Sequence, residues 1–264
     1  MPDRTSAPRI EFLGVRFNLI PADRILNAVL ALAGDSTFSY VVTPNVDHVV
    51  RLHGPQGERL GPALDAADLV ICDSRILARL AVLSGCSMPL MPGSDLTRDL
   101  LGAVADPMRI AIIGGDAALH ARIAADFPII DWQFHEPPMG VLNNAKARAD
   151  IARFVVESGP DITLFAIGAP QSEIVCQEIK TDGRARGVAL CIGASLEFLI
   201  GVKQRAPRWM QRAGLEWLFR LLSEPRRLWR RYLIEGPKIF PIWWRWNRRR
   251  SHPRAGSGSS RAGG

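Results

Sequence analysis

The residues with the clearest chemical potential in this chain stand where apolar segments end. Asp73 follows the run Leu-Val-Ile-Cys and precedes a helix-forming segment, so it acts either as a helix N-cap or as a base partly shielded from water. Thr43 and Asn45 flank Pro44 after another apolar run. Asn45 is suited to capping the next helix, and both side chains are suited to binding a sugar or a phosphate. The residue types alone leave both alternatives open at each position.

Two turns in the middle of the chain are suited to a nucleotide. Gly114 and Gly115 precede a helix whose first N–H groups suit a phosphate or ribose, although a tight turn explains the same glycines. The segment GAPQSE, residues 168–173, is a second strand-to-helix turn. The helix dipole alone accounts for Glu173, because an acidic side chain is favourable at the positive N-terminal end of a helix. Gln171 is suited to binding a base or a sugar hydroxyl.

A metal site is not expected. The chain has no HExxH motif, no paired Cys/His set and no acidic pair of the DxD kind. The four cysteines lack metal-ligand spacing and are expected to be reduced in a cytosolic protein; they are Cys72, Cys86, Cys176 and Cys191. We therefore expect neither a metal nor a cofactor.

Alternating strand and helix patterns must position these residues. The strands are apolar, which predicts a Rossmann-like α/β fold, a mostly parallel sheet with helices on both faces. In such sheets ligands collect at the carboxyl ends of the strands, where the residues named above fall. Strands are predicted at 10–20 (a short pair), 38–45, 68–74, 108–116, 129–135, 161–170 and 188–195. Helices are predicted at 21–34, 46–53, 75–85, 96–105, 117–127, 144–159 and 171–183.

The C-terminal part differs in composition from the rest. The net charge of +7 belongs mainly there, because only three acids occur between Lys203 and Arg254. Six tryptophans fall among Leu and Arg, as in a helix that lies at a membrane surface. They are Trp209, Trp217, Trp229, Trp243, Trp244 and Trp246. The same segment suits packing on the main domain or binding RNA, but the tryptophans favour an anionic membrane surface over nucleic acid.

These patterns predict four regions. They are a flexible arm (1–9), a catalytic Rossmann-like domain (10–200), a basic helical appendage that associates with a membrane (201–250), and a disordered tail (251–264). No signal peptide is evident, and no run reaches the roughly 18 apolar residues of a membrane span. We expect a peripheral protein on the cytoplasmic face of the inner membrane. The sequence does not decide the oligomeric state, and a homo-oligomer is one of the states that it allows.

Taken together, the motifs resemble those of one family. The TPN turn, the strand-end Asp, PGSDL, IGG, GAPQSE and RAPRWMQRAGLEWLFRLLSEPRRLWRRY are similar to the bacterial WecG/TagA/CpsF glycosyltransferases from about Ile10 to about Trp246. The resemblance implies inverting, metal-independent transfer of a sugar from a UDP-sugar to a polyprenyl-diphosphate-linked saccharide in cell-surface polysaccharide synthesis. The sugars used in the family include ManNAc, ManNAc-uronic acid, glucose and glucuronic acid. A non-catalytic membrane adaptor is the alternative.

The resemblance also assigns roles to individual residues. It implies that Asp73 is the base, with Thr43 and Asn45 beside it. Substrate or nucleotide binding falls on Gly114, Gly115, Gly168, Pro170, Gln171, Glu173 and Arg75. Diphosphate binding falls on the appendage residues Lys203, Arg205, Arg208 and Arg212, with Arg220, Arg227 and Arg230 further along.

Three positions depart from the family pattern. Ser74-Arg75 follows Asp73 where Gly is common, and Leu90 stands where an Arg is common, so Arg75 is a candidate replacement for that cation. In the GAPQSE turn, Ser172 separates Gln171 from Glu173 and the Gln is shifted by one position.

Overall fold

The computed structural model describes residues 7–251, and its centre is a six-stranded parallel sheet. The strand order is β4-β3-β8-β7-β5-β6, and every neighbouring pair is parallel. The strands are β3 (Ser39–Val42), β4 (Leu69–Val70), β5 (Arg109–Ile113), β6 (Asp131–His135), β7 (Ile162–Phe165) and β8 (Val188–Cys191). The predicted α/β fold with a mostly parallel sheet is confirmed. The first six residues of the predicted arm and nearly all of the predicted tail, from residue 252 on, lie outside the described residues.

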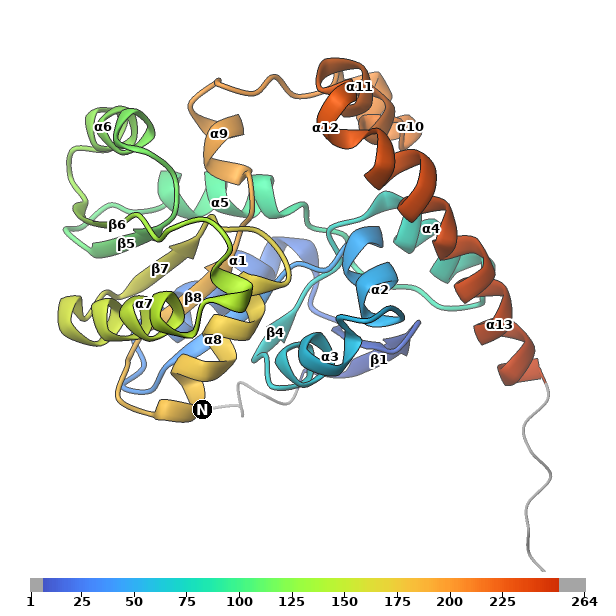
Figure 1. Ribbon diagram of the computed structural model, residues 1–264, viewed down its shortest axis with the longest axis horizontal. Coiled ribbons are helices and arrows are strands. Elements are labelled where there is room, and N and C mark those ends of the chain that lie inside the picture. The colour runs from blue at the N-terminus through green and yellow to red at the C-terminus, as the bar shows by residue number, and fades with distance from the viewer. Residues whose placement is uncertain (1–6, 252–264) are drawn as a thin grey trace, which may run out of the picture.

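Helices cover both faces of the sheet (Figure 1). Alternate strand residues enter two cores: Tyr40 and Val42 pack with α3, α7 and α8, whereas Val41 packs with α1, α5 and α6. The helices of this part are α1 (Ala22–Ala33), α2 (Val46–Leu52), α3 (Gly57–Asp65), α4 (Arg75–Leu83), α5 (Gly93–Gly102), α6 (Ala117–Asp126), η1 (Val141–Asn143), α7 (Ala145–Ser158), α8 (Gln171–Asp182) and α9 (Ser195–Leu199).

The predicted N-terminal strand pair is an antiparallel hairpin. Strand β1 (Arg9–Phe12) pairs with β2 (Val15–Asn18), and the turn places Leu13 and Gly14 at positive φ. Phe12 and Phe17 are fully buried. The side-chain oxygen of Asn18 accepts a hydrogen bond from the Val70 N–H at 2.8 Å, which joins the hairpin to the edge strand of the main sheet.

Several elements differ from the sequence prediction, and helices α3, α5 and α9 are among them. Helix α3 was not predicted, because Gly57, Gly61 and Pro62 interrupt its weak apolar pattern. Helix α5 begins at Gly93, three residues before the predicted start, because Pro92 directs the chain into a helix whose first turn carries Asp95.

The C-terminal appendage, residues 201–250, is helical and ends in one long rod (Figure 1). Helices α10 (Arg208–Ala213) and α11 (Glu216–Ser223) precede an unbroken run of α12 (Pro225–Trp229), the π-helix η2 (Arg230–Glu235), η3 (Gly236–Lys238) and α13 (Ile239–Ser251). The rod packs on α4 and on the hairpin. Trp243 Nε1 donates to Ser84 Oγ at 2.8 Å, and the Trp246 ring meets Phe12 edge-on at 5.1 Å. Within residues 7–251, no helix is both long and apolar enough to cross a membrane.

Candidate active site

A cavity of about 1400 Å³ lies between the carboxyl ends of the strands and the appendage. Its volume is above the usual range for one small ligand, so it has room for two substrates. It brings together most of the predicted site residues, namely Thr43, Asn45, Asp73, Arg75, Gly114, Gly115, Gly168, Gln171, Glu173 and Lys203. Pro170, Arg205, Arg208 and Arg212 are not among the residues that line it.

Asp73 is held rigidly at the wall of this cavity. Its backbone N–H donates to the Pro44 carbonyl at 3.1 Å, and its Oδ1 accepts from the Gly93 N–H at 2.9 Å. A Cβ at position 93 would lie 3.0 Å from Thr43 Oγ1, so glycine permits this close approach. The N-cap of α4 is Ser74 instead, whose Oγ accepts from the Leu77 N–H. The Asp73 carboxylate is therefore not used as a cap.

Burial raises the pKa of Asp73 to about 6, and the Gly93 N–H and the Arg220 guanidinium offset only part of this effect. A carboxylate with a pKa near 6 is a stronger base than an ordinary Asp but is still ionised at neutral pH. These two properties suit the removal of a proton from a hydroxyl.

Thr43 and Asn45 lie beside Asp73 with their own side chains engaged. Asn45 caps α2, because its Oδ1 accepts from the Asp47 N–H at 3.0 Å. Thr43 Oγ1 donates to the Cys191 carbonyl at 3.4 Å. The capping interpretation of Asn45 is confirmed, and its place in the cavity wall leaves a further role open to its amide group.

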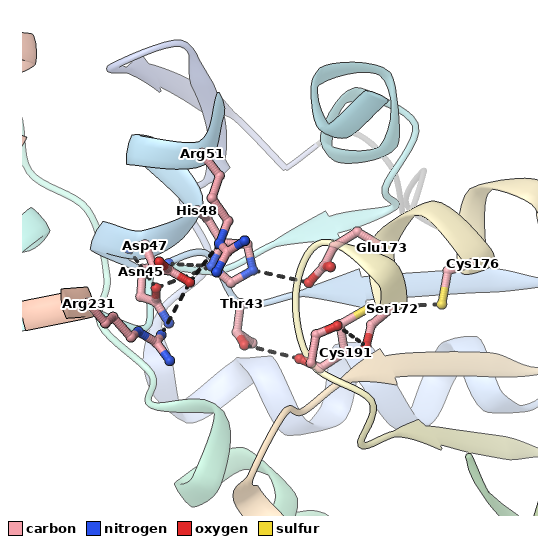
Figure 2. Close-up of polar contacts among 11 residues, drawn as sticks. Thr43, Asn45, Asp47, His48, Arg51, Ser172, Glu173, Cys176, Cys191 and Arg231 are labelled. Carbon is pink, nitrogen blue, oxygen red and sulfur yellow. Dashed lines mark hydrogen bonds and ion pairs between the residues drawn. The ribbon is translucent and has the colours of Figure 1, made fainter. Parts of the chain in front are cut away.

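A buried pair that the sequence did not predict joins α2 to α8 (Figure 2). His48 Nε2 lies 3.1 Å from Glu173 Oε1, and both side chains are almost completely buried. His48 also completes a capping box, since its Nδ1 is 3.3 Å from the Asn45 backbone nitrogen. His48 was not predicted as a site residue, because it meets Glu173, 125 positions away in the sequence, only in the folded chain.

Both glycine-containing turns line the cavity, and each has structural reasons for its residues. Gly114 has φ of 102°, and a Cβ there would come within 2.9 Å of Ile167. In the second turn Ala169–Pro170 is a cis peptide, Gln171 Nε2 donates to the Ile167 carbonyl, and Ser172 Oγ donates to the Gly168 carbonyl at 3.0 Å. The Gln171 amide is thus engaged with its own backbone.

The cations that line the cavity are not the ones the sequence analysis put first. Lys203 lines it and contacts Glu197 at 2.5 Å, but Arg205 contacts Asp95 at 2.6 Å, while Arg208 and Arg212 are exposed. In their place the rod and α11 supply three guanidinium groups, Arg220, Arg227 and Arg231. Arg230, which the resemblance indicated, is exposed and does not line the cavity.

Arg220 has hydrogen-bonding capacity to spare. Its guanidinium stacks over the Phe198 ring at 4.6 Å. Its Nε is buried, lies 3.9 Å from Glu216 Oε1, and has no hydrogen-bond partner among the described residues. A buried N–H of a permanent cation without an acceptor favours an anionic ligand at this point.

Arg231 ties the appendage to α2 (Figure 2). One of its terminal nitrogens is 3.5 Å from Asp47 Oδ2, which also accepts from Arg51 Nε at 2.9 Å. Burial raises the pKa of Asp47, but Arg231 and Arg51 outweigh it and bring the pKa below its usual value. Asp47 is therefore a stable anion between two cations.

The appendage also supplies apolar and aromatic side chains to the cavity. Trp217, Tyr232 and Ile239 line it, together with Leu233 and Phe240, whose side chains are more than half exposed. The strand ends thus supply polar residues to the cavity, whereas the appendage supplies both a cationic belt (Lys203, Arg220, Arg227 and Arg231) and these apolar side chains.

The departures from the family pattern also lie in this cavity. Leu90 lines it and forms an isolated parallel bridge with Cys72, and Arg75 lines it as well. Among the described residues, no group of three or more His, Cys, Asp or Glu side chains is arranged to hold a metal ion.

Comparison with known proteins gives the family to which this fold and cavity belong. Residues 10–253 match the Glycosyl transferase WecG/TagA/CpsF family, and the chain belongs to it. It is also similar to an N-acetylglucosaminyldiphosphoundecaprenol N-acetyl-beta-D-mannosaminyltransferase from Bacillus spizizenii. The two are 28% identical over 202 residues, which cover 74% of this chain and 75% of that relative. The resemblance inferred from the motifs is confirmed.

Proposed function

We propose that the protein transfers a sugar from a UDP-sugar to a polyprenyl-diphosphate-linked saccharide, with inversion and without a metal ion, in the synthesis of a cell-surface polysaccharide. The name of the Bacillus relative supports N-acetylmannosamine as the transferred sugar and a diphosphoundecaprenol acceptor. ManNAc-uronic acid, glucose and glucuronic acid are the other sugars that fit the family.

The observation that carries the proposal is the position of Asp73. The Asp73 carboxylate, whose pKa is raised, lines the cavity and is fixed by the Gly93 N–H. As base it takes the proton of the acceptor hydroxyl while that oxygen bonds to the anomeric carbon of the donor. The bond from the anomeric carbon to the UDP oxygen breaks on the opposite side, so the configuration inverts and UDP leaves with the electron pair.

The cationic belt supports the second half of the reaction. UDP gains negative charge as it leaves, and Arg and Lys side chains stabilise such charge without a metal ion. The same belt suits the diphosphate of the acceptor, and the Gly114-Gly115 turn and the 168–173 turn suit the nucleotide.

The apolar edge of the appendage suits a substrate that stays in a bilayer. Along the rod Trp229, Leu233, Phe240 and Trp244 expose 45%, 56%, 54% and 52% of their surfaces and follow one another at roughly helical spacing. Exposed aromatic and aliphatic side chains among arginines are typical of a helix at an anionic membrane surface. We propose that the protein binds the cytoplasmic face of the inner membrane as a peripheral protein through residues 201–250, with the cavity facing the lipid-linked acceptor.

The test is turnover by the purified protein with UDP-N-acetylmannosamine and a short-chain lipid-diphosphate acceptor, measured as released UDP. We expect Asp73→Asn to lower turnover at least about a hundredfold, in line with the loss of a general base. Asp65→Asn, at an exposed ion pair of α3 with Arg16 outside the cavity, is the matched control and should turn over normally. Equal rates for Asp73→Asn and the parent would rule out Asp73 as the base. Failure of the parent to bind UDP would favour the non-catalytic adaptor.

A further inference from the structure

Glu173 has one carboxylate oxygen that nothing in the described protein uses. The side chain is 2% exposed and stands in the first turn of α8, at the cavity wall. Oε1 contacts His48 Nε2 at 3.1 Å, but Oε2 is buried and has no hydrogen-bond partner among the described residues. An unpartnered carboxylate oxygen in such a place is unfavourable unless a ligand completes it.

The hydrogen bonds around His48 define what Glu173 offers to a ligand. His48 Nδ1 lies 3.2 Å from Asn45 Oδ1 and 3.3 Å from the Asn45 backbone nitrogen, whose N–H donates to it in the capping box. With Nδ1 as the acceptor of that box, the proton of the neutral ring is on Nε2, which donates to Glu173 Oε1. Glu173 therefore acts as an acceptor through Oε1, and Oε2 is the oxygen that it offers to a ligand as a second acceptor. A group that binds Oε2 must be a hydrogen-bond donor.

Charge indicates which part of a nucleotide sugar binds to Glu173 Oε2. A phosphate has no proton to donate at neutral pH and is repelled by a carboxylate. The cationic belt belongs to residues 203–231; Arg51, Arg75 and Arg122 also line the cavity, and Arg51 is paired with Asp47. Glu173 is on α8, close to the TPN turn through His48 and Asn45. The diphosphate suits the cationic belt, and the hydroxylated parts of the molecule suit the Glu173 side.

We propose that Glu173, oriented by His48, accepts a hydrogen bond from a hydroxyl group of the nucleotide sugar. His48 is then a positioning residue, and Glu173 is a binding residue that selects for this hydroxyl. The inference rests on the proposed use of a UDP-sugar. The hydroxyl belongs either to the ribose or to the transferred sugar, and the two sources are separable by experiment.

The experiment is calorimetric titration of the parent and of Glu173→Gln with four ligands: UDP, 2′-deoxy-UDP, 3′-deoxy-UDP and UDP-N-acetylmannosamine. The Gln side chain keeps an acceptor for His48 but replaces Oε2 by an NH₂ group. If the bound hydroxyl belongs to the ribose, the variant should bind UDP at least about tenfold more weakly than the parent does. This difference between variant and parent should disappear for one of the two deoxy ligands. A hydroxyl of the transferred sugar predicts a loss for UDP-N-acetylmannosamine alone.

Glu178→Gln is the matched control, because Glu178 lies on the same helix, is partly exposed and pairs with Arg148. If Glu173→Gln does not fold, Glu173→Asp keeps the charge but withdraws it by one methylene, and the same pattern of losses is expected. Affinities within twofold of the parent for all four ligands, or an equal loss for all four, would overturn the inference. A parent that binds no UDP would instead overturn the proposed function itself, so the two failures are distinguishable.

Discussion

The carboxylate of Asp73 and the backbone N–H of Gly93 are joined by a hydrogen bond of 2.9 Å across twenty positions of the chain. The bond orients the proposed base and also fixes the start of α5 beside the segment that follows β4. It favours the ionised carboxylate, yet burial is the stronger effect, and the net result is a pKa of about 6. The first two predictions follow from this balance.

Activity should follow the ionisation of Asp73. With a pKa of about 6, kcat/KM should be constant at pH 7 to 8 and should fall about tenfold for each pH unit below about 6. The measurement is initial rate at low donor concentration between pH 5 and 8, with circular dichroism at each pH to show that the protein stays folded. A rate independent of pH over this range would contradict the assignment of Asp73 as the base.

Stability should show the opposite dependence. The folded pKa of Asp73 lies above the ordinary value of 3.8, so the folded protein holds this proton more tightly than the unfolded chain does. Its contribution is most favourable below pH 3.8 and is lost as the pH rises through about 6. Asp73→Asn should therefore raise the free energy of unfolding by up to about 3 kcal/mol at pH 8 and by less at pH 4. The measurement is the melting temperature of parent and variant at both pH values. A variant no more stable than the parent at pH 8 would show that the carboxylate is not strained by burial.

The sequence predicted the framework better than the contacts within it. Apolar runs and helix signals are local properties, so the sheet, the hairpin and the strand-end location of Asp73 follow from them. The Glu173–His48 pair does not, because the two residues meet only after α2 and α8 pack together. Arg205 and Arg231 illustrate the same limit. Both are arginines of one basic segment, and only the path of the rod places Arg231 in the cavity while Arg205 pairs with Asp95.

Arg220 should bind the diphosphate of a substrate. Its buried Nε has no acceptor in the described protein, and loss of a charge-assisted hydrogen bond corresponds to about a ten- to hundredfold loss of binding. We expect Arg220→Ala to raise KM by this factor for the donor or the acceptor, with a smaller effect at high salt. Arg226→Ala, an exposed arginine outside the cavity, is the control and should match the parent. Equal effects of the two substitutions would show that Arg220 acts through the net positive charge of the surface and does not bind the diphosphate directly.

Removal of divalent metal should leave turnover unchanged. The cavity presents Lys203, Arg220, Arg227 and Arg231 for the charge that develops on UDP, and fixed cations perform the stabilisation that a metal ion performs in other transferases. Initial rates after dialysis against EDTA should stay within twofold of those with Mg²⁺ added back. Loss of activity with EDTA and recovery with Mg²⁺ would show that the proposed metal-independent reaction is wrong.

Exposed apolar side chains outside the cavity should hold the protein on a membrane. Leu222, Trp229 and Trp244 expose 70%, 45% and 52% of their surfaces, and the Arg248 guanidinium lies over the Trp244 ring at 3.9 Å, so apolar and cationic groups occur on the same helix. We expect the triple change Leu222→Ser, Trp229→Ser and Trp244→Ser to lower binding to phosphatidylglycerol vesicles at least about tenfold in sedimentation assays, since each side chain loses burial in lipid.

The same triple variant separates membrane binding from chemistry. None of the three residues lines the cavity, so turnover of a water-soluble short-chain acceptor should be unchanged, whereas turnover of a long-chain acceptor in vesicles should fall. Ile129→Ser changes an exposed apolar residue next to β6 and is the control for loss of apolar surface as such. If the triple variant bound vesicles as the parent does, these side chains would have another partner. If both acceptors were affected equally, the appendage would act on the cavity directly and not through the membrane.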